Sequence, residues 1–101
     1  MEAEYFKNAI CEELDGAKDY AMRAMEIKPM SATWHGKLVE MSTQELAHAK
    51  QLFAMWQEYY GIQTKNRMDN IPEYLEEMNT CITETYLEEL AKVQMIHSQI
   101  K

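Results

Sequence analysis

A single short break, Lys28-Pro29-Met30-Ser31, separates two long stretches that have the apolar spacing of α-helices. Pro29 cannot continue a helix, and Ser31 is a suitable N-cap for the helix that follows. Because so short a connection keeps consecutive helices adjacent, the two stretches are predicted to pack as an antiparallel hairpin. We expect helices over about 2–28 and about 32–60.

A third helix is expected at about 71–99, after the polar connection GIQTKNRMDN. Gly61 is predicted to end the second helix as its C′ residue. Asn70 is predicted to cap the third helix, with Pro72 in its first turn and Glu73 closing a capping box. Only 3 Gly and 2 Pro occur in 101 residues, which is little punctuation for a β-sheet protein. The chain is therefore predicted to be one all-α domain, 1–101.

Each predicted helix has an apolar stripe at alternating spacings of four and three, and polar residues interrupt each stripe. The first stripe is Phe6, Ile10, Glu13, Ala17, Tyr20, Ala24 and Ile27. The second is Leu38, Met41, Glu45, His48, Leu52, Met55 and Tyr59. The third is Leu75, Met78, Ile82, Tyr86, Glu89, Val93, Ile96 and Ile100. Because a buried carboxylate without a partner costs several kcal/mol or becomes neutral, each inward Glu requires an explanation.

Glu13, Glu45 and His48 are expected to meet in one layer of the hairpin. Glu13 lies 17 residues before Met30 and Glu45 lies 15 residues after it. At about 1.5 Å per residue, the two carboxylates come level to within about 3 Å. Taken alone, Glu13 also fits a carboxylate hydrogen-bonded to Tyr20. Together, one Glu from one helix and Glu-x-x-His from the next form half of the ligand set of a di-iron carboxylate site.

The runs EELDGAKDYA and EMSTQELAHAKQLF resemble the first half of a rubrerythrin-type, ferritin-like protein, across roughly residues 6–56. By this resemblance Glu13 is the ligand from the first helix, Glu45 the bridging carboxylate and His48 the terminal imidazole. Tyr20 is then the residue that orients Glu13.

Rubrerythrins carry a second such half and often a rubredoxin module, and this chain has neither. It is therefore similar to the encapsulated ferritins, in which two short chains pool their half-sites. The resemblance implies a homodimer or higher homo-oligomer that completes a four-helix-type bundle and holds iron, with ferroxidase or iron-handling activity. It also admits a protein shell or another assembly partner.

Two other functions remain open from the residues. The chain fits a non-catalytic helical assembly or interaction protein on a ferritin-like scaffold, with the third helix as its docking surface. It also fits a structural zinc or manganese site, which needs one Glu-Glu-His set and no dimer. Glu89 is either a further ligand or a carboxylate paired with Lys92, Lys37 or another cation. His97 is predicted to be structural or surface-exposed, and no partner is predicted for His35.

Composition excludes several classes of protein. The formal net charge is −7, and the 10 Lys and Arg residues are dispersed, which argues against nucleic-acid binding. No apolar run approaches the roughly 18 residues of a membrane span, and MEAEYFKNA lacks the features of a signal peptide, so we expect a cytoplasmic protein. Cys11 and Cys81 are predicted to be free thiols, and the 9 Met residues to fill gaps in the core.

Overall fold

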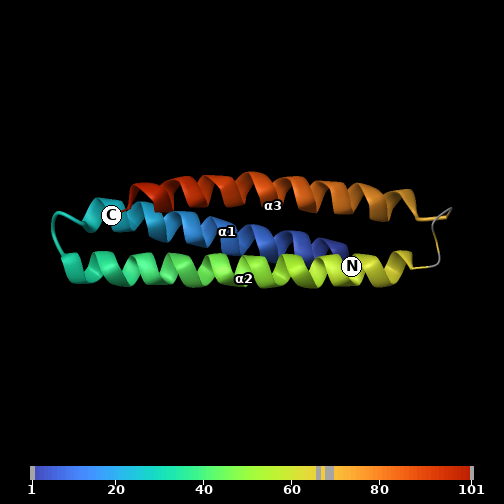
Figure 1. Ribbon diagram of the computed structural model, residues 1–101, viewed down its shortest axis with the longest axis horizontal. Helices are drawn as coiled ribbons and strands as arrows, with labels where there is room; N and C mark the ends of the chain where they lie inside the picture. The colour runs from blue at the N-terminus through green and yellow to red at the C-terminus, as the bar shows by residue number, and fades with distance from the viewer. Residues whose placement is uncertain (1, 66, 68–69, 101) are drawn as a thin grey trace.

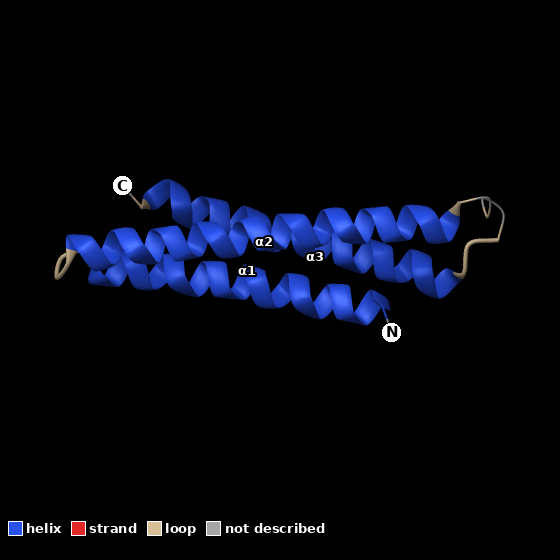
Figure 2. Cartoon of the chain, turned by 90° about the horizontal axis from the view of Figure 1, so that it is seen from below, coloured by secondary structure: helices blue, strands red, loops and turns tan. Residues whose placement is uncertain are grey.

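The computed structural model describes residues 2–65, 67 and 70–100 and contains three long helices. They are α1 (Glu2–Ile27), α2 (Ala32–Thr64) and α3 (Glu73–Gln99), and the described residues include no strand. The helices lie side by side in a rod of 57 × 18 × 16 Å, with α2 antiparallel to both α1 and α3 (Figures 1 and 2). The prediction of an all-α chain built on a helical hairpin is confirmed.

The turn between α1 and α2 follows the chemistry expected of Pro29 and Ser31. Helix α1 ends at Ile27, whose carbonyl oxygen accepts hydrogen bonds from the backbone N–H groups of Met30 and Ser31. The Ser31 hydroxyl oxygen then accepts a hydrogen bond from the backbone N–H of Trp34 at 3.1 Å. This N-cap satisfies one of the free donors at the start of α2.

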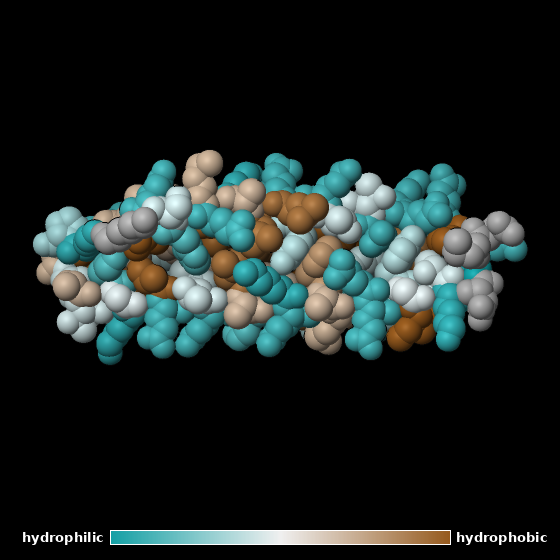
Figure 3. Space-filling view, in the orientation of Figure 1, coloured by the Kyte–Doolittle hydropathy of each residue, from teal (hydrophilic) through white to brown (hydrophobic). Residues whose placement is uncertain are grey.

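Helix α3 covers one face of the α1–α2 hairpin, and the core lies where the three helices meet. Trp56 of α2 is fully buried, and its indole N–H donates a hydrogen bond of 2.9 Å to Oδ1 of Asn79 on α3. Phe53 of α2 stacks on Tyr86 of α3 with ring centroids 4.0 Å apart. Apolar side chains follow the seam between α2 and α3 in Figure 3, with hydrophilic side chains along both rims.

Two predicted helix boundaries are wrong. Helix α2 continues past Gly61 to Thr64, because a glycine inside a helix costs only about 1 kcal/mol, and Tyr59 and Tyr60 beside it pack against the core. Helix α3 begins at Glu73 after Pro72, and no side chain caps it, so the capping box predicted from Asn70 and Glu73 does not form.

The apolar stripe predicted for α2 is displaced by one residue. The side of α2 that is fully buried consists of Ser42, Leu46, Ala49, Phe53 and Trp56. The predicted stripe lies beside it and is half-buried at Leu38 and Leu52 but exposed at Met41 and Met55. Since α2 packs on α1 as well as under α3, it needs a wide apolar arc, and periodicity does not identify the centre of that arc.

The prediction that methionines fill gaps in the core is also wrong for most of those described. Met78 is half-buried against the core, whereas the other six that the structure describes are exposed. The exposed ones are Met22, Met25, Met30, Met41, Met55 and Met95. Flexible thioether side chains at a surface are suited to contacts with other molecules.

Among the described residues, no helix has the length and apolar character needed to cross a membrane.

Candidate metal centre

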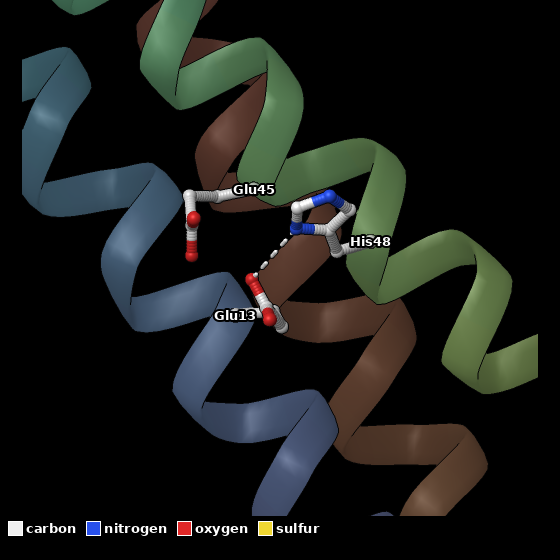
Figure 4. A group of neighbouring side chains, drawn as sticks. All are labelled: Glu13, Glu45 and His48. Carbon is white, nitrogen blue, oxygen red and sulfur yellow. Dashed lines mark ion pairs between the residues drawn. The ribbon is translucent and has the colours of Figure 1, made fainter.

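The structure brings Glu13, Glu45 and His48 together on the face of the hairpin that α3 does not cover. Glu13 comes from α1, and Glu45 and His48 come from consecutive turns of α2, so their side chains converge between the two helices while α3 lies behind (Figure 4). One potential ligand atom from each residue lies within 4.8 Å of the other two. Nδ1 of His48 is 3.5 Å from Oε2 of Glu13. The predicted convergence is therefore confirmed.

The two carboxylates of this group are only partly compensated, by His48 at ion-pair distance from Glu13. Oε2 of Glu13 is buried and has no hydrogen-bond partner within the described part of the chain. The pKa of Glu45 is raised first by hydrogen bonding of its protonated form to the Glu13 side chain, then by burial and by the negative charge of Glu13, and His48 opposes this shift. A bound cation would bind the Glu13 oxygen that has no hydrogen bond and would offset the repulsion between the carboxylates.

Gly16 makes room for Glu45. A Cβ atom at Gly16 would lie 2.9 Å from Oε2 of Glu45, closer than such atoms approach in practice. The carboxylate of Glu45 therefore rests directly on the backbone of α1, one turn beyond Glu13. Gly16 was not among the predicted site residues, although a glycine inside a long helix is a signal that something approaches the backbone closely. Ala17 and Ala49, one turn beyond Glu13 and Glu45 on their helices, are fully buried in the core.

The donor set fits a transition-metal ion. Carboxylate oxygens and an imidazole nitrogen suit iron, manganese and zinc. Ligand atoms bonded at about 2.1 Å to one tetrahedral ion lie about 3.4 Å apart, so three atoms within 4.8 Å of one another can share an ion after rotation of the side chains. His48 is 54% exposed, which leaves one side of the group open to solvent. Three protein ligands and an open side are the arrangement of a reactive centre or of half a larger one.

Tyr20 and Glu89 do not join the group. Tyr20 is half-buried on α1, and the described residues show no hydrogen bond between it and Glu13. Glu89 lies on α3 and accepts a hydrogen bond of 3.0 Å from Nζ of Lys92, with Nζ of Lys18 at 3.9 Å. Of the two interpretations of Glu89, the structure favours the paired carboxylate. Its partners are Lys92, as predicted, and Lys18 in place of Lys37.

The two remaining histidines have structural roles. His97 on α3 lies 2.7 Å from the hydroxyl of Ser42, which itself donates a hydrogen bond of 2.5 Å to the carbonyl oxygen of Ala17. Because the hydroxyl has one proton, His97 is the donor and the chain of hydrogen bonds joins all three helices. His35, for which no partner was predicted, has Nδ1 2.8 Å from the carbonyl oxygen of Ala24. Cys11 and Cys81 are free thiols, as predicted.

The environment of His97 predicts a pH-dependent stability. Burial, and then the charge of Lys50, lower the pKa of His97 below its ordinary value. The unfolded chain therefore takes up this proton first, at about pH 6.5, and the stabilisation due to neutral His97 is lost as the pH falls below that value. Urea unfolding at pH 7.5 and pH 5.5 should show a larger loss of stability in the wild type than in His97→Gln. An equal change in both proteins would contradict the assignment.

Comparisons with protein families, with curated proteins and with solved structures found no match for this chain. The case for a function therefore rests on the geometry of the Glu13, Glu45 and His48 group.

Proposed function

We propose that this chain is a metal-binding protein whose ligands are Glu13, Glu45 and His48, and that iron is the metal it handles. The observation that carries the proposal is the buried Oε2 of Glu13, which takes part in no hydrogen bond in the described part of the chain and belongs to a group of three potential ligand atoms within 4.8 Å of one another. Nδ1 of His48 lies 3.5 Å from this oxygen, at ion-pair distance but too far for a good hydrogen bond. Mixed carboxylate and imidazole ligands suit the ferrous, ferric and manganous ions better than softer ions.

The proposed centre is completed by a second copy of the chain. Three ligands and an open side are half of a di-iron carboxylate site, and two copies supply four carboxylates and two imidazoles. In that arrangement Glu45 would be shared between the two ions, and Glu13 and His48 of each chain would together hold one ion. The ferritin-like resemblance of the sequence points to the same ligand roles and to an assembly of two or more chains.

Ferroxidation is the activity we propose for the completed centre, with ferrous iron as the substrate. Two ferrous ions each lose one electron, and dioxygen takes both electrons with two protons to give hydrogen peroxide. The chain's contribution is to hold the ions through Glu13, Glu45 and His48 and to keep an open side for the oxidant. The negative carboxylates favour the ferric product, because a higher charge interacts more strongly with them.

The test of this proposal is metal uptake by the wild type and by two charge-matched variants of α2. Glu45→Gln removes a ligand and also the repulsion from Glu13, so the metal-free variant is expected to be at least as stable as the wild type. Glu40→Gln makes the same substitution at an exposed position of the same helix, outside the ligand group. After anaerobic addition of ferrous iron and desalting, we expect about one iron per chain in the wild type and Glu40→Gln, and background levels in Glu45→Gln.

The chemistry of the bound ion separates the proposal from its alternatives. Exposure to air should then produce a ferric absorption band in the wild type and in Glu40→Gln. Binding of zinc with no oxidation of added iron would indicate a structural site instead. If Glu45→Gln retains the iron of the wild type, the assigned ligands are wrong.

An interaction protein remains the second candidate, and the exposed aromatic and methionine side chains favour it. Trp34 is 62% exposed and Met55 is 53% exposed, both on the α1–α2 side of the molecule. A protein that refuses every added metal ion but still self-associates would support this function.

A further inference from the structure

The face of the hairpin that carries Glu13, Glu45 and His48 also has a groove on each side of that group. The turn-end groove, near the turn between α1 and α2, has a volume of about 310 Å³ and is lined by Arg23, Ile27, Trp34, Lys37, Leu38 and Met41. The open-end groove has a volume of about 400 Å³ and extends from Glu13 and His48 toward the start of α1. Its further lining residues are Tyr5, Ala9, Glu12, Gln51, Leu52 and Met55. Both grooves lie between α1 and α2.

The two grooves are equally far from one level of the hairpin. The contact between Glu45 and the backbone at Gly16 marks that level. On α2, Leu38 lies seven residues before Glu45 and Leu52 lies seven residues after it. Seven residues are about two helical turns, so Leu38, Glu45 and Leu52 point to the same side of α2. Leu38 and Leu52 each lie about 10 Å from Glu45 along the helix axis.

The same relation holds on α1. Arg23 of the turn-end groove lies seven residues after Gly16, and Ala9 of the open-end groove lies seven residues before it. Ile27 and Tyr5 are each eleven residues from Gly16. A second copy can be related to the first by a two-fold axis that passes through this level, perpendicular to the helices and in the plane of the face. The open-end groove of the second copy then lies over the turn-end groove of the first.

Charge favours a two-fold axis perpendicular to the helices over one parallel to them. The turn-end groove is rimmed by the cations Arg23 and Lys37, whereas the open-end groove carries the anions Glu12 and Glu13. Arg23 has an exposed ion pair with Glu26 at 2.9 Å, which contributes little and leaves other N–H donors available. An axis across the helices brings cations toward anions. An axis parallel to the helices would bring the two cationic grooves together.

We propose that this face is the surface through which two copies of the chain associate, with the turn-end groove of each copy seated on the partner's open-end groove. Leu38 then lies opposite the partner's Leu52, and Arg23 lies within reach of the partner's Glu12. The two Glu45 side chains meet at the axis, which is where a bridging ligand belongs. This inference rests on the proposed function for its account of Glu45, but the pairing of grooves stands on shape, register and charge.

Disulfide trapping in the metal-free protein tests the pairing directly. In a Cys11→Ser, Cys81→Ser background, Leu38→Cys and Leu52→Cys are introduced singly and the two proteins are mixed with diamide and a chelator. We expect a cross-linked heterodimer from the mixture and little dimer from either single variant. The two positions are about 21 Å apart within one chain, so a disulfide inside the chain cannot form. Leu87→Cys, at an exposed position of α3, measures cross-linking by random collision.

A charge reversal provides a second measurement that does not depend on thiol geometry. Arg23→Glu and Glu12→Arg are each expected to weaken self-association at least several-fold in sedimentation equilibrium, and the double variant is expected to recover it. A mixture that cross-links no better than Leu87→Cys, or a double variant no tighter than its parents, would overturn the pairing. Cross-linking without iron uptake would instead remove the proposed function and leave this surface standing. Iron uptake by a chain that stays monomeric would remove both this surface and the shared centre, and would leave only metal binding by Glu13, Glu45 and His48 of one chain.

Discussion

Gly16→Ala is expected to lower metal affinity at least tenfold while leaving the fold intact. The added Cβ would stand 2.9 Å from Oε2 of Glu45, and the carboxylate can move away because it is the end of a flexible side chain. Folding therefore loses little, since alanine also improves a helix interior by about 0.5–1 kcal/mol over glycine. The Glu45 carboxylate, however, is displaced from the position in which it would bind the metal ion. Displacing the residues that support a ligand typically costs 10-fold to 100-fold in affinity.

Gly36→Ala is the matched control, because a Cβ at that position of α2 meets nothing within 4 Å. It should raise the free energy of unfolding by about 0.5–1 kcal/mol and leave metal affinity unchanged. Calorimetric titration with ferrous or zinc ions and urea unfolding, run on both variants, measure the two quantities separately. If Gly16→Ala binds metal as tightly as Gly36→Ala does, the close approach of Glu45 to α1 has no part in the site.

The hairpin and its ligand group could be predicted because they depend on local signals. Pro29 and Ser31 determine where α1 stops and α2 starts, and the constant rise of a helix then sets the height of Glu13 against that of Glu45. The apolar period of the third helix is likewise a local signal, and it predicts that helix correctly. These features need no knowledge of how the helices pack.

The errors concern features that packing decides. Periodicity indicates that α2 is apolar along one side, but packing against both α1 and α3 determines that Leu46 and Trp56 are buried while Met41 and Met55 are exposed. Gly16 was overlooked because its role appears only when Glu45 from another helix lies on it. The site is consequently nearer to the surface than a stripe buried in the core would have placed it. That position is what makes a shared site with a second copy feasible.

Trp56→Ala is expected to lower the free energy of unfolding by about 3–5 kcal/mol, which is a large share of the roughly 5–15 kcal/mol available to a domain of this size. Trp56 is fully buried and packs at ring-centroid distances of 5.8 Å from Phe6 and 6.0 Å from Tyr60. Its removal leaves a cavity at the junction of the three helices. It also deprives Oδ1 of Asn79 of its donor, which breaks a hydrogen bond between α2 and α3.

The second tryptophan of the same helix is the natural control. Trp34 is 62% exposed, so Trp34→Ala should change the stability of the isolated chain by no more than about 0.5 kcal/mol. Urea unfolding followed by circular dichroism, at protein concentrations low enough to keep the chain monomeric, gives both values. Equal losses in the two variants would contradict the placement of Trp56 in a core where the three helices meet. At higher concentrations the proposed pairing of grooves predicts that Trp34→Ala weakens self-association, because Trp34 lines the turn-end groove. The two tryptophans therefore separate what holds one chain together from what holds two chains together.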